Sequence, residues 1–458
     1  KSEFEELTKL AEQGDAEAQY RLARYYEKRD NSVANDDVEA VKWYRKAAEQ
    51  GHAAAQYGLG FMYEHTYGIE SIPELNRTEA FKWHQREEAF KWYQKAADQG
   101  NLRAKDILKT DWWQVMQVVL QKRQEVKEEV QPEDPVAGTK PPEAGSVSPR
   151  FKYKITGDEV TITGGGRASG ALTIPATIEG KPVTSIGWEA FWGRRSLTSI
   201  TIPDSVTSIG LAAFWGCSKL SRITIPDSVT SIGNNAFNLC NSLTSITIPD
   251  SVTSIGDNFQ GRKSLTTINV GTENLNYTDV NGVLFNKEKT VLIAYPASKT
   301  GNKYAIPDSV TSIGQYAFNY CKNLTSITIP DSVTGIGAAA FSECKNLTSI
   351  IIPDSVTSIG SEAFWNCRKL ISIKIPDSVT SIGDTAFFDC TGLTSITIGD
   401  GVTSIGEDAF SWCPSLTAVT FLGHAPKEVA EVFSESTPTI YRKPEAKGWG
   451  DTFAGRPV

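Results

Sequence analysis

The chain has 458 residues, 40% of them hydrophobic, so it is long enough and apolar enough for two or three domains with buried cores. Its net charge of −8 is modest, and neither end has the basic excess of a nucleic-acid-binding domain, so we expect no nucleic-acid partner. It has no run of about 18 apolar residues, and we therefore expect no membrane span. Because the chain begins with Lys1 and not Met, we expect a processed or shortened product, with any signal peptide lying outside it.

Residues 1–110 contain an Ala-rich pattern that occurs three times. The copies start at Ala11, Ala48 and Ala97, each has Gly three residues later, and apolar residues recur at i, i+3 and i+4. This spacing is typical of amphipathic helices that end at a glycine. We predict an α/α solenoid in which small residues let paired helices approach closely, and in which the pairs Trp43-Tyr44 and Trp92-Tyr93 fill the space between them.

The string Lys-Trp-Tyr-Gln-Lys-Ala-Ala-Asp-Gln-Gly at 91–100 resembles the Sel1-like repeat, a relative of the tetratricopeptide repeat. The resemblance covers residues 1–110 and implies a protein–protein adaptor module. Three repeats are close to the minimum for a stable array.

Two short segments follow the helical repeats. Residues 111–130 place Trp112, Trp113, Met116, Val119 and Leu120 on one stripe, which predicts a helix that caps the open end of the array. The alternative is a helix that docks a partner. Residues 131–150 are rich in proline and are predicted to be a semi-extended linker.

A motif of the form Leu-Thr-Ser-Ile-Thr-Ile-Pro-Asp-Ser-Val-Thr-Ser-Ile-Gly recurs through residues 151–458, with a period of 23 residues. Its Pro-Asp pair begins at Pro203, Pro226, Pro249, Pro307, Pro330, Pro353 and Pro376, and a Gly399-Asp400 variant follows. Self-similarity at this period predicts a solenoid, whose regular surface suits binding better than catalysis.

One coil, 220–242, shows how the motif folds. Leu220, Ile223 and Ile225 are predicted to point inward from a short strand, Pro226-Asp227 makes a turn, and Phe237 lies buried under a short helical turn. Stacked coils then form a parallel sheet and a column of phenylalanines. This Phe column is Phe191, Phe214, Phe237, Phe259, Phe318, Phe341, Phe364, Phe387 and Phe410.

All seven cysteines occupy one further column, three residues after a repeat phenylalanine. They are Cys217, Cys240, Cys321, Cys344, Cys367, Cys390 and Cys413. An odd number of thiols in a single column argues against a disulfide framework, because parallel side chains rarely meet the required dihedral angle. We expect reduced, buried thiols that have a structural role.

The Ile-Pro-Asp-Ser-Val-Thr-Ser-Ile-Gly…Ala-Phe…Cys pattern resembles the BspA-type (treponemal) leucine-rich repeat over nearly all of 172–420. The resemblance implies a bacterial surface or secreted protein that binds a protein or polysaccharide. It implies no catalytic residue and no cofactor.

The step from Pro249 to Pro307 is 58 residues, longer than two periods. Within it, 274–285 and 290–296 alternate as two strands of a β-hairpin, with 286–289 as the turn. We expect a hairpin insertion at about 272–304 that bulges from the stack.

Variation between coils is concentrated just after the Phe column, which makes this the candidate binding site. Aromatic residues there cannot share the core that the preceding phenylalanine fills, and exposed aromatic residues mark binding surfaces. The candidates are Trp192, Trp215, Tyr320, Trp365, Phe388 and Trp412. The alternative is that they pack flat over the neighbouring turn.

Three other columns favour structural explanations. A basic column (Arg195, Lys219, Lys263, Lys322, Lys345, Lys369) is typical of a solvated edge, with attraction of acidic glycans as the alternative. The Asp of each Pro-Asp pair offers one carboxylate per coil, too few oxygens for calcium. The outward Thr column, interrupted by Ile351 and Lys374, is too narrow to indicate ice binding.

The four histidines have no metal-site spacing, and we expect no metal, no cofactor and no enzyme activity.

These observations favour a non-enzymatic adhesion protein, extracellular or on the cell surface, whose solenoid binds a protein or glycan and whose helical repeats bind a second protein. The first alternative is a self-assembling, homo-oligomeric component of a surface layer or filament. The second is a cytoplasmic adaptor, which reduced cysteines would suit.

Overall fold

A computed structural model shows two compact units, Lys1–Ala144 and Gly145–Val458, each described here by itself. The structure describes residues 2–27, 37–65, 79–101, 104–105, 108, 151–256, 263–427 and 431–458. The capping helix at 111–130, the linker at 131–150 and Phe259 of the Phe column lie outside the described residues.

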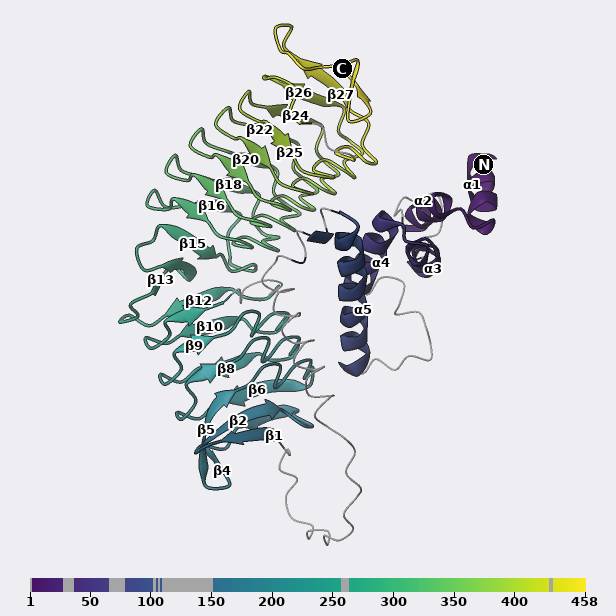
Figure 1. Cartoon of the computed structure of the whole chain (residues 1–458). Helices are drawn as coiled ribbons and strands as arrows, with labels where there is room; N and C mark the ends of the chain where they lie inside the picture. The colour runs from purple at the N-terminus through teal and green to yellow at the C-terminus, as the bar shows by residue number, and fades with distance from the viewer. Residues whose placement is uncertain are drawn as a thin grey trace. The chain divides into compact units, whose positions relative to one another are not determined.

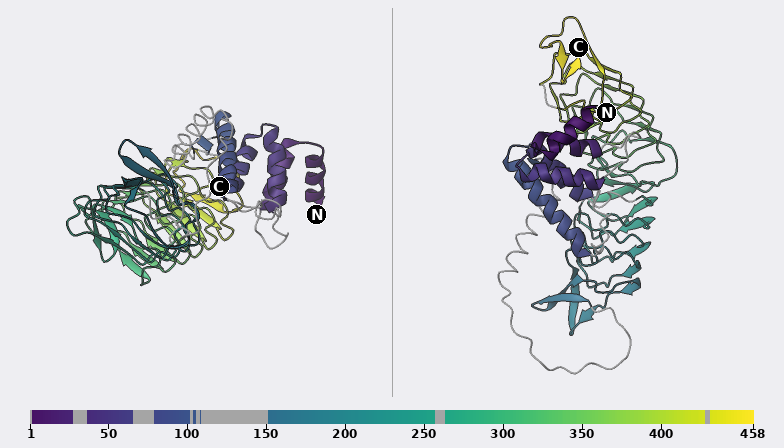
Figure 2. Two further views of the ribbon diagram at one scale, coloured as in Figure 1. Left: turned by 90° about the horizontal axis from the view of Figure 1, so that it is seen from below. Right: turned by 90° about the vertical axis from the view of Figure 1, so that its right-hand side faces the viewer.

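The first unit is the predicted α/α solenoid, and its helices lie side by side (Figure 2). They are α1 (Ser2–Glu12), α2 (Ala16–Glu27), α3 (Asp37–Glu49), α4 (Ala53–His65) and α5 (Glu79–Asp98). Tyr44 and Tyr93 are buried against Gly58 and Gly60, where any Cβ would lie 2.8 Å from the tyrosine ring. Small residues therefore do permit the close approach that the sequence predicts.

Each helical repeat is tied to the next by glutamines. Gln50 donates to the side chain of Gln19 at 2.7 Å, and Gln99 donates to that of Gln56 at 2.8 Å. Gln19 and Gln56 are buried and donate in turn to the carbonyl oxygens of Ala11 and Ala48. A buried amide is stable only when its partners are supplied, so this ladder accounts for the repeated Gln-Gly and Ala-Gln pairs.

The second unit is a parallel β-solenoid of about 12 turns over residues 160–442 (Figure 1). Each coil begins with a longer strand, which pairs in parallel with its equivalent in a neighbouring coil. These longer strands are β3 (Gly170–Thr173), β6 (Leu197–Thr201), β8 (Arg222–Thr224), β10 (Ser245–Ile248), β12 (Thr267–Val270), β16 (Lys303–Ala305), β18 (Ser326–Thr328), β20 (Ser349–Ile351), β22 (Ser372–Ile375), β24 (Ser395–Ile398), β26 (Ala418–Phe421) and β27 (Thr439–Arg442).

A second layer of short strands, not predicted from the sequence, follows the Pro-Asp turn. It comprises β5 (Lys181–Ile186), β7 (Ser208–Ile209), β9 (Ser231–Ile232), β11 (Ser254–Ile255), β17 (Ser312–Ile313), β19 (Gly335–Ile336), β21 (Ser358–Ile359), β23 (Ser381–Ile382) and β25 (Ser404–Ile405). At the N-terminal end, β2 (Glu159–Gly164) pairs with β1 (Lys152–Thr156) and β5, while β4 (Thr177–Ile178) also pairs with β5. Strands β28 (Thr452–Phe453) and β29 (Arg456–Pro457) form a terminal hairpin.

Hydroxyl groups join the coils and explain the repeated Ser-Val-Thr string. Ser355 Oγ donates to the Val333 carbonyl at 2.6 Å, and Thr357 Oγ1 donates to the Thr334 carbonyl at 3.1 Å. Equivalent bonds recur from coil to coil. The motif therefore repeats for structural reasons: each hydroxyl supplies a partner to a carbonyl group of the preceding coil.

The Phe column is buried and continuous in the described coils. Phe364 stacks between Phe341 and Phe387, with ring centroids 5.2 and 5.1 Å away. The column also includes Tyr295 and Phe433, which the sequence analysis did not include. Below it, the thiol of Cys367 donates to the Phe341 carbonyl at 3.2 Å, and all seven cysteines are buried and free of disulfides.

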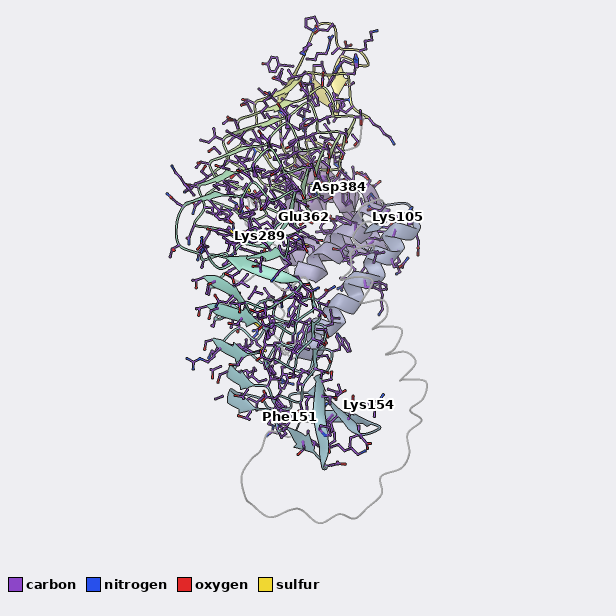
Figure 3. The ribbon with its side chains drawn as sticks, turned by 90° about the vertical axis from the view of Figure 1, so that its left-hand side faces the viewer. Lys105, Phe151, Lys154, Lys289, Glu362 and Asp384 are labelled. Carbon is purple, nitrogen blue, oxygen red and sulfur yellow. The ribbon has the colours of Figure 1, made fainter. Side chains whose placement is uncertain are left out.

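The segment around each column phenylalanine is a run of turns, and this corrects the predicted helical turn. Two positions per coil, two residues before and two after the phenylalanine, have positive φ in most coils. Examples are Glu362 (58°), Asn366 (59°), Thr385 (51°) and Asp389 (56°). Left-handed residues interrupt a right-handed helix and cost about 1 kcal/mol or more each when they carry a Cβ. Figure 3 labels Glu362, whose amide donates to the Asp384 carbonyl of the next coil at 2.9 Å.

Thr385→Gly is expected to raise the free energy of unfolding by about 1 kcal/mol, because a β-branched residue is the least suited to φ near 51° and glycine adopts it freely. Urea denaturation of the full chain measures the change. Thr394→Gly is the control: its hydroxyl donates to the Ile371 carbonyl at 3.0 Å, so its loss is expected to lower stability. A destabilised Thr385→Gly protein would contradict the strain assigned to this turn.

The insertion contains a hairpin, but the predicted first strand, 274–285, is divided into two strands by a turn at Asn281 and Gly282. Strand β14 (Val283–Asn286) pairs antiparallel with both β13 (Tyr277–Val280) and β15 (Val291–Ala294), and β15 then pairs in parallel with β17. Leu284 packs into the N-terminal core, whereas Val283 and Phe285 pack into the C-terminal core. Because successive strand residues face opposite sides, β14 is buried on both faces and joins the two halves of the solenoid.

Candidate functional site

The six candidate aromatic residues, called the turn-side aromatic residues below, lie on the turns that follow the Phe column. Trp192 exposes only 8% of its surface, because its ring stacks on Trp215 at 5.2 Å with an interplanar angle of 2°. Trp215, Tyr320, Trp365, Phe388 and Trp412 are half-buried. These five residues are each partly exposed, as a binding surface requires, and partly packed on the coil, as the alternative interpretation of the sequence predicts.

The structure brings some of these rings together and leaves others apart. Phe388 and Trp412, in adjacent coils, have ring centroids 6.4 Å apart and an interplanar angle of 42°. Tyr320 instead lies under the ammonium group of Lys263, which is 4.8 Å from its ring centroid. The aromatic surface therefore consists of separate clusters: Trp192 with Trp215, Tyr320 with Lys263, and Phe388 with Trp412.

A polar network holds the turns on either side of Trp365. Asn366 donates to Glu343 at 2.6 Å, and Arg368 donates to Asn366 at 2.6 Å while pairing with Asp389 at 2.8 Å. Lys345 pairs with the nearly buried Glu343 at 2.8 Å. Charged groups that are bonded on several sides fix neighbouring loops, so this part of the surface is preorganised.

The strand side carries exposed apolar groups that the sequence analysis only partly identified. Ile351 is 79% exposed and was noted as an exception in the Thr column. Ile371 is 56% exposed and was missed. The sequence feature that could have identified Ile371 is the absence of a hydroxyl group at a position that is Thr in the neighbouring coils. The equivalent Thr348 donates its hydroxyl to the Thr325 carbonyl at 3.0 Å. Ile371 has no hydroxyl donor, and its amide lies 3.5 Å from the Thr348 carbonyl.

Leu275, Trp188, Leu239 and Tyr441 are also exposed and were not predicted as site residues. Leu275 lies beside Asn274, whose buried amide anchors the start of the insertion by donating to the carbonyl groups of Pro249 and Val252. Leu239 has the same position in its coil as Tyr320 and Trp412, two residues after the column phenylalanine and with positive φ.

The Asp column is exposed in all eight coils that carry it. Asp250 and Asp377 each accept a backbone amide of the following coil, at 2.9 and 3.1 Å. Within the described ranges, no group of three or more His, Cys, Asp or Glu residues is arranged to hold a metal ion. The carboxylates therefore act as single, separated charges along one edge.

Histidine and cysteine side chains occupy structural positions where they are described. His52 lies against Glu17 at 2.9 Å and stacks on Tyr20 at 4.8 Å inside the helical array. His424 Nδ1 accepts the Lys447 amide at 2.9 Å. Burial raises the pKa of the Cys321, Cys367 and Cys390 thiols, so these groups stay protonated and are poor nucleophiles at neutral pH.

In the parts of the chain that the structure describes, no helix combines the length and apolar character that crossing a membrane requires.

Two arrays of repeats, one helical and one of stacked β-coils, define a repeat protein of the interaction-scaffold class. The chain belongs to the BspA type leucine rich repeat family, whose model matches residues 172–291 and 294–435. The Sel1 repeat model matches residues 16–52, 53–86 and 85–101. Repeats of both kinds are non-catalytic protein-interaction modules.

Solved structures of bacterial leucine-rich repeat proteins are similar to the solenoid. The pneumococcal vaccine antigen PcpA shares 22% identity with a TM-score of 0.51, over 65% of this chain and 93% of that one. A leucine rich cell surface protein of Faecalibacterium prausnitzii shares 30% identity with a TM-score of 0.39, over 63% and 96% of the two chains. A leucine-rich repeat protein of Eubacterium ventriosum shares 30% identity with a TM-score of 0.45, over 62% and 80%. No match is found among curated protein sequences.

Proposed function

We propose that the protein is a non-enzymatic adhesion protein at the bacterial cell surface, whose solenoid binds a protein or polysaccharide partner through the turn-side aromatic residues. The observation that carries the proposal is the set of half-buried rings at Trp215, Tyr320, Trp365, Phe388 and Trp412. Half-buried aromatic residues are held in place by their packed side and lose little conformational freedom on binding, which is why they dominate contact energies.

Location at the cell surface is supported by the family and by two similar proteins, one a vaccine antigen and the other a cell surface protein. The Sel1 repeats would hold a second protein. Tyr44 and Tyr93 are buried in their core, so that contact would use the outer helix faces.

A capture experiment with immobilised full chain and native extracellular material tests the proposal. Replacing Trp215, Trp365, Phe388 and Trp412 with Ser is expected to weaken binding of the captured partner about 30-fold or more, since the loss of even one aromatic hot spot costs about 2 kcal/mol. The matched control replaces Ile351 and Ile371 of the strand side with Ser and is expected to bind normally. Unfolding midpoints of both variants show whether the solenoid remains folded. Equal binding by both variants would refute the assignment.

A further inference from the structure

Charge is segregated along each coil of the solenoid. The stretches that lead into and form the longer strands contain no Asp or Glu, and all of them except 240–249 and 390–399 contain Lys or Arg. These stretches are 194–203, 217–226, 240–249, 263–270, 299–307, 321–330, 344–353, 367–376 and 390–399. The carboxylate of each Pro-Asp turn follows immediately at the other end of the strand. The strand layer therefore has a cationic edge (Arg195, Lys219, Lys263, Lys322) and an acidic edge (Asp204, Asp227, Asp250, Asp308, Asp331, Asp354, Asp377, Asp400).

Both edges are open to solvent. Every residue of the two edges is exposed. Within the described residues, the side chains of Arg195, Lys219 and Lys322 have no ion-pair partner, and neither do the acidic-edge carboxylates. Lys345 and Arg368 differ, because Glu343 and Asp389 already neutralise them. The free charges thus lie where a partner of opposite charge can approach.

In three coils, a cation of the cationic edge and a carboxylate of the acidic edge occur together. Arg195 and Asp204 belong to one coil, Lys219 and Asp227 to the next, and Lys322 and Asp331 to a later one. Like charges spaced by one coil, about 5 Å, repel one another weakly in water. The acidic edge of a second copy places a carboxylate in each of the coils that carry these cations and relieves the repulsion there.

We propose that the solenoid associates side by side with a second copy of this chain, the acidic edge of one molecule lying against the cationic edge of the next, with the two stacks parallel. The contact is heterologous, since different surfaces meet, and each molecule keeps one edge free for a further copy. It therefore builds a sheet of parallel solenoids. Each exposed pair contributes little by itself and is screened by salt, so the assembly needs several pairs and depends on ionic strength.

This contact uses the strand edges and leaves the turn-side aromatic residues free. It is independent of the proposed partner binding, and the two fail separately: one is measured by the mass of the pure protein, the other by capture of a different molecule.

Sedimentation velocity of the pure full chain tests the proposal with a charge exchange. At about 20 mM salt, where screening is weak, the mean mass is expected to rise with protein concentration, and at about 500 mM salt it is expected to stay that of the monomer. One variant carries Asp204→Lys, Asp227→Lys and Asp331→Lys; the other carries Arg195→Glu, Lys219→Glu and Lys322→Glu, in the same three coils. Each alone is expected to associate about 10-fold more weakly or worse, and their equimolar mixture is expected to associate again.

A wild-type chain that stays monomeric at low salt would overturn the proposal, as would variants that associate unmixed or a mixture that does not recover. A monomeric wild type that instead binds soluble heparin, lost in the Arg195→Glu, Lys219→Glu, Lys322→Glu variant, would also overturn it, and would assign the cationic edge to an anionic polymer.

Discussion

Phe364→Ala is expected to lower the free energy of unfolding by about 4 kcal/mol. Phe364 is fully buried and stacked between Phe341 and Phe387. Its removal loses the buried apolar surface and leaves a cavity that the neighbouring rings cannot fill, because their own coils hold them. Coils contact mainly their neighbours, so the defect is also expected to uncouple the two parts of the stack and broaden the transition.

Urea denaturation of the full chain, followed by far-ultraviolet circular dichroism, measures this effect. Trp365→Ala, at the adjacent half-buried position, is the matched control and is expected to cost less than half as much. Similar costs for the two substitutions would show that the Phe column is not the main source of cohesion between coils.

Gly360→Ala is expected to cost about 3 kcal/mol although it adds only a methyl group. A Cβ at this position would lie 2.6 Å from the Ala338 amide nitrogen and 2.7 Å from the Gly337 carbonyl carbon. Both are backbone atoms of the preceding coil, so the coils must move apart to admit it. Gly233, Gly337 and Gly383 are in the same situation, which explains why the motif ends in glycine.

Gly335→Ala provides the control, because a Cβ there has no neighbour within 4 Å. Its effect is expected to stay within about 0.5 kcal/mol. Thermal and urea unfolding of the two variants give the comparison. An unaffected Gly360→Ala protein would mean that the coils are less closely stacked than the structure shows.

Much of the fold could be predicted from the sequence because the repeat supplies the same evidence many times. The period places Phe364 above Phe387, and the Ala-Gly pattern around Tyr44 indicates packed helices. The second strand layer was missed because a two-residue strand such as Ser358–Ile359 has no alternation to detect. The predicted helical turn was wrong because positive φ at Glu362 and Asn366 is set by bonds to the next coil and not by local propensity.

The packing of the hairpin insertion could not be predicted from its sequence. Residues 274–285 were predicted as one strand of the hairpin, but they form β13 and β14, which pair with each other. Strand β14 is buried on both faces, with Leu284 and Phe285 in different cores. Which cores meet at an insertion depends on how the flanking coils stack, and the sequence of the insertion alone does not contain that information.

The sequence placed the candidate residues in one column but could not predict how exposed each ring is. Trp192 and Trp215 have the same position in the motif, yet Trp192 is nearly buried because the next coil carries a tryptophan to stack on it. Exposure at such positions depends on the pair of residues in neighbouring coils. Ile371 could have been identified as exposed because it lacks the hydroxyl group that the equivalent residues Thr348 and Thr394 donate to the preceding coil.

Hydrogen exchange on the full chain, with and without the partner recovered by capture, tests most directly whether the turn-side aromatic residues form the contact. Slower exchange on binding is predicted for the turns at 365–367, 388–390 and 412–413, with strands β20 and β22 unchanged. Protection confined to β20 and β22, around Ile351 and Ile371, would contradict the assignment and place the binding surface on the strand side.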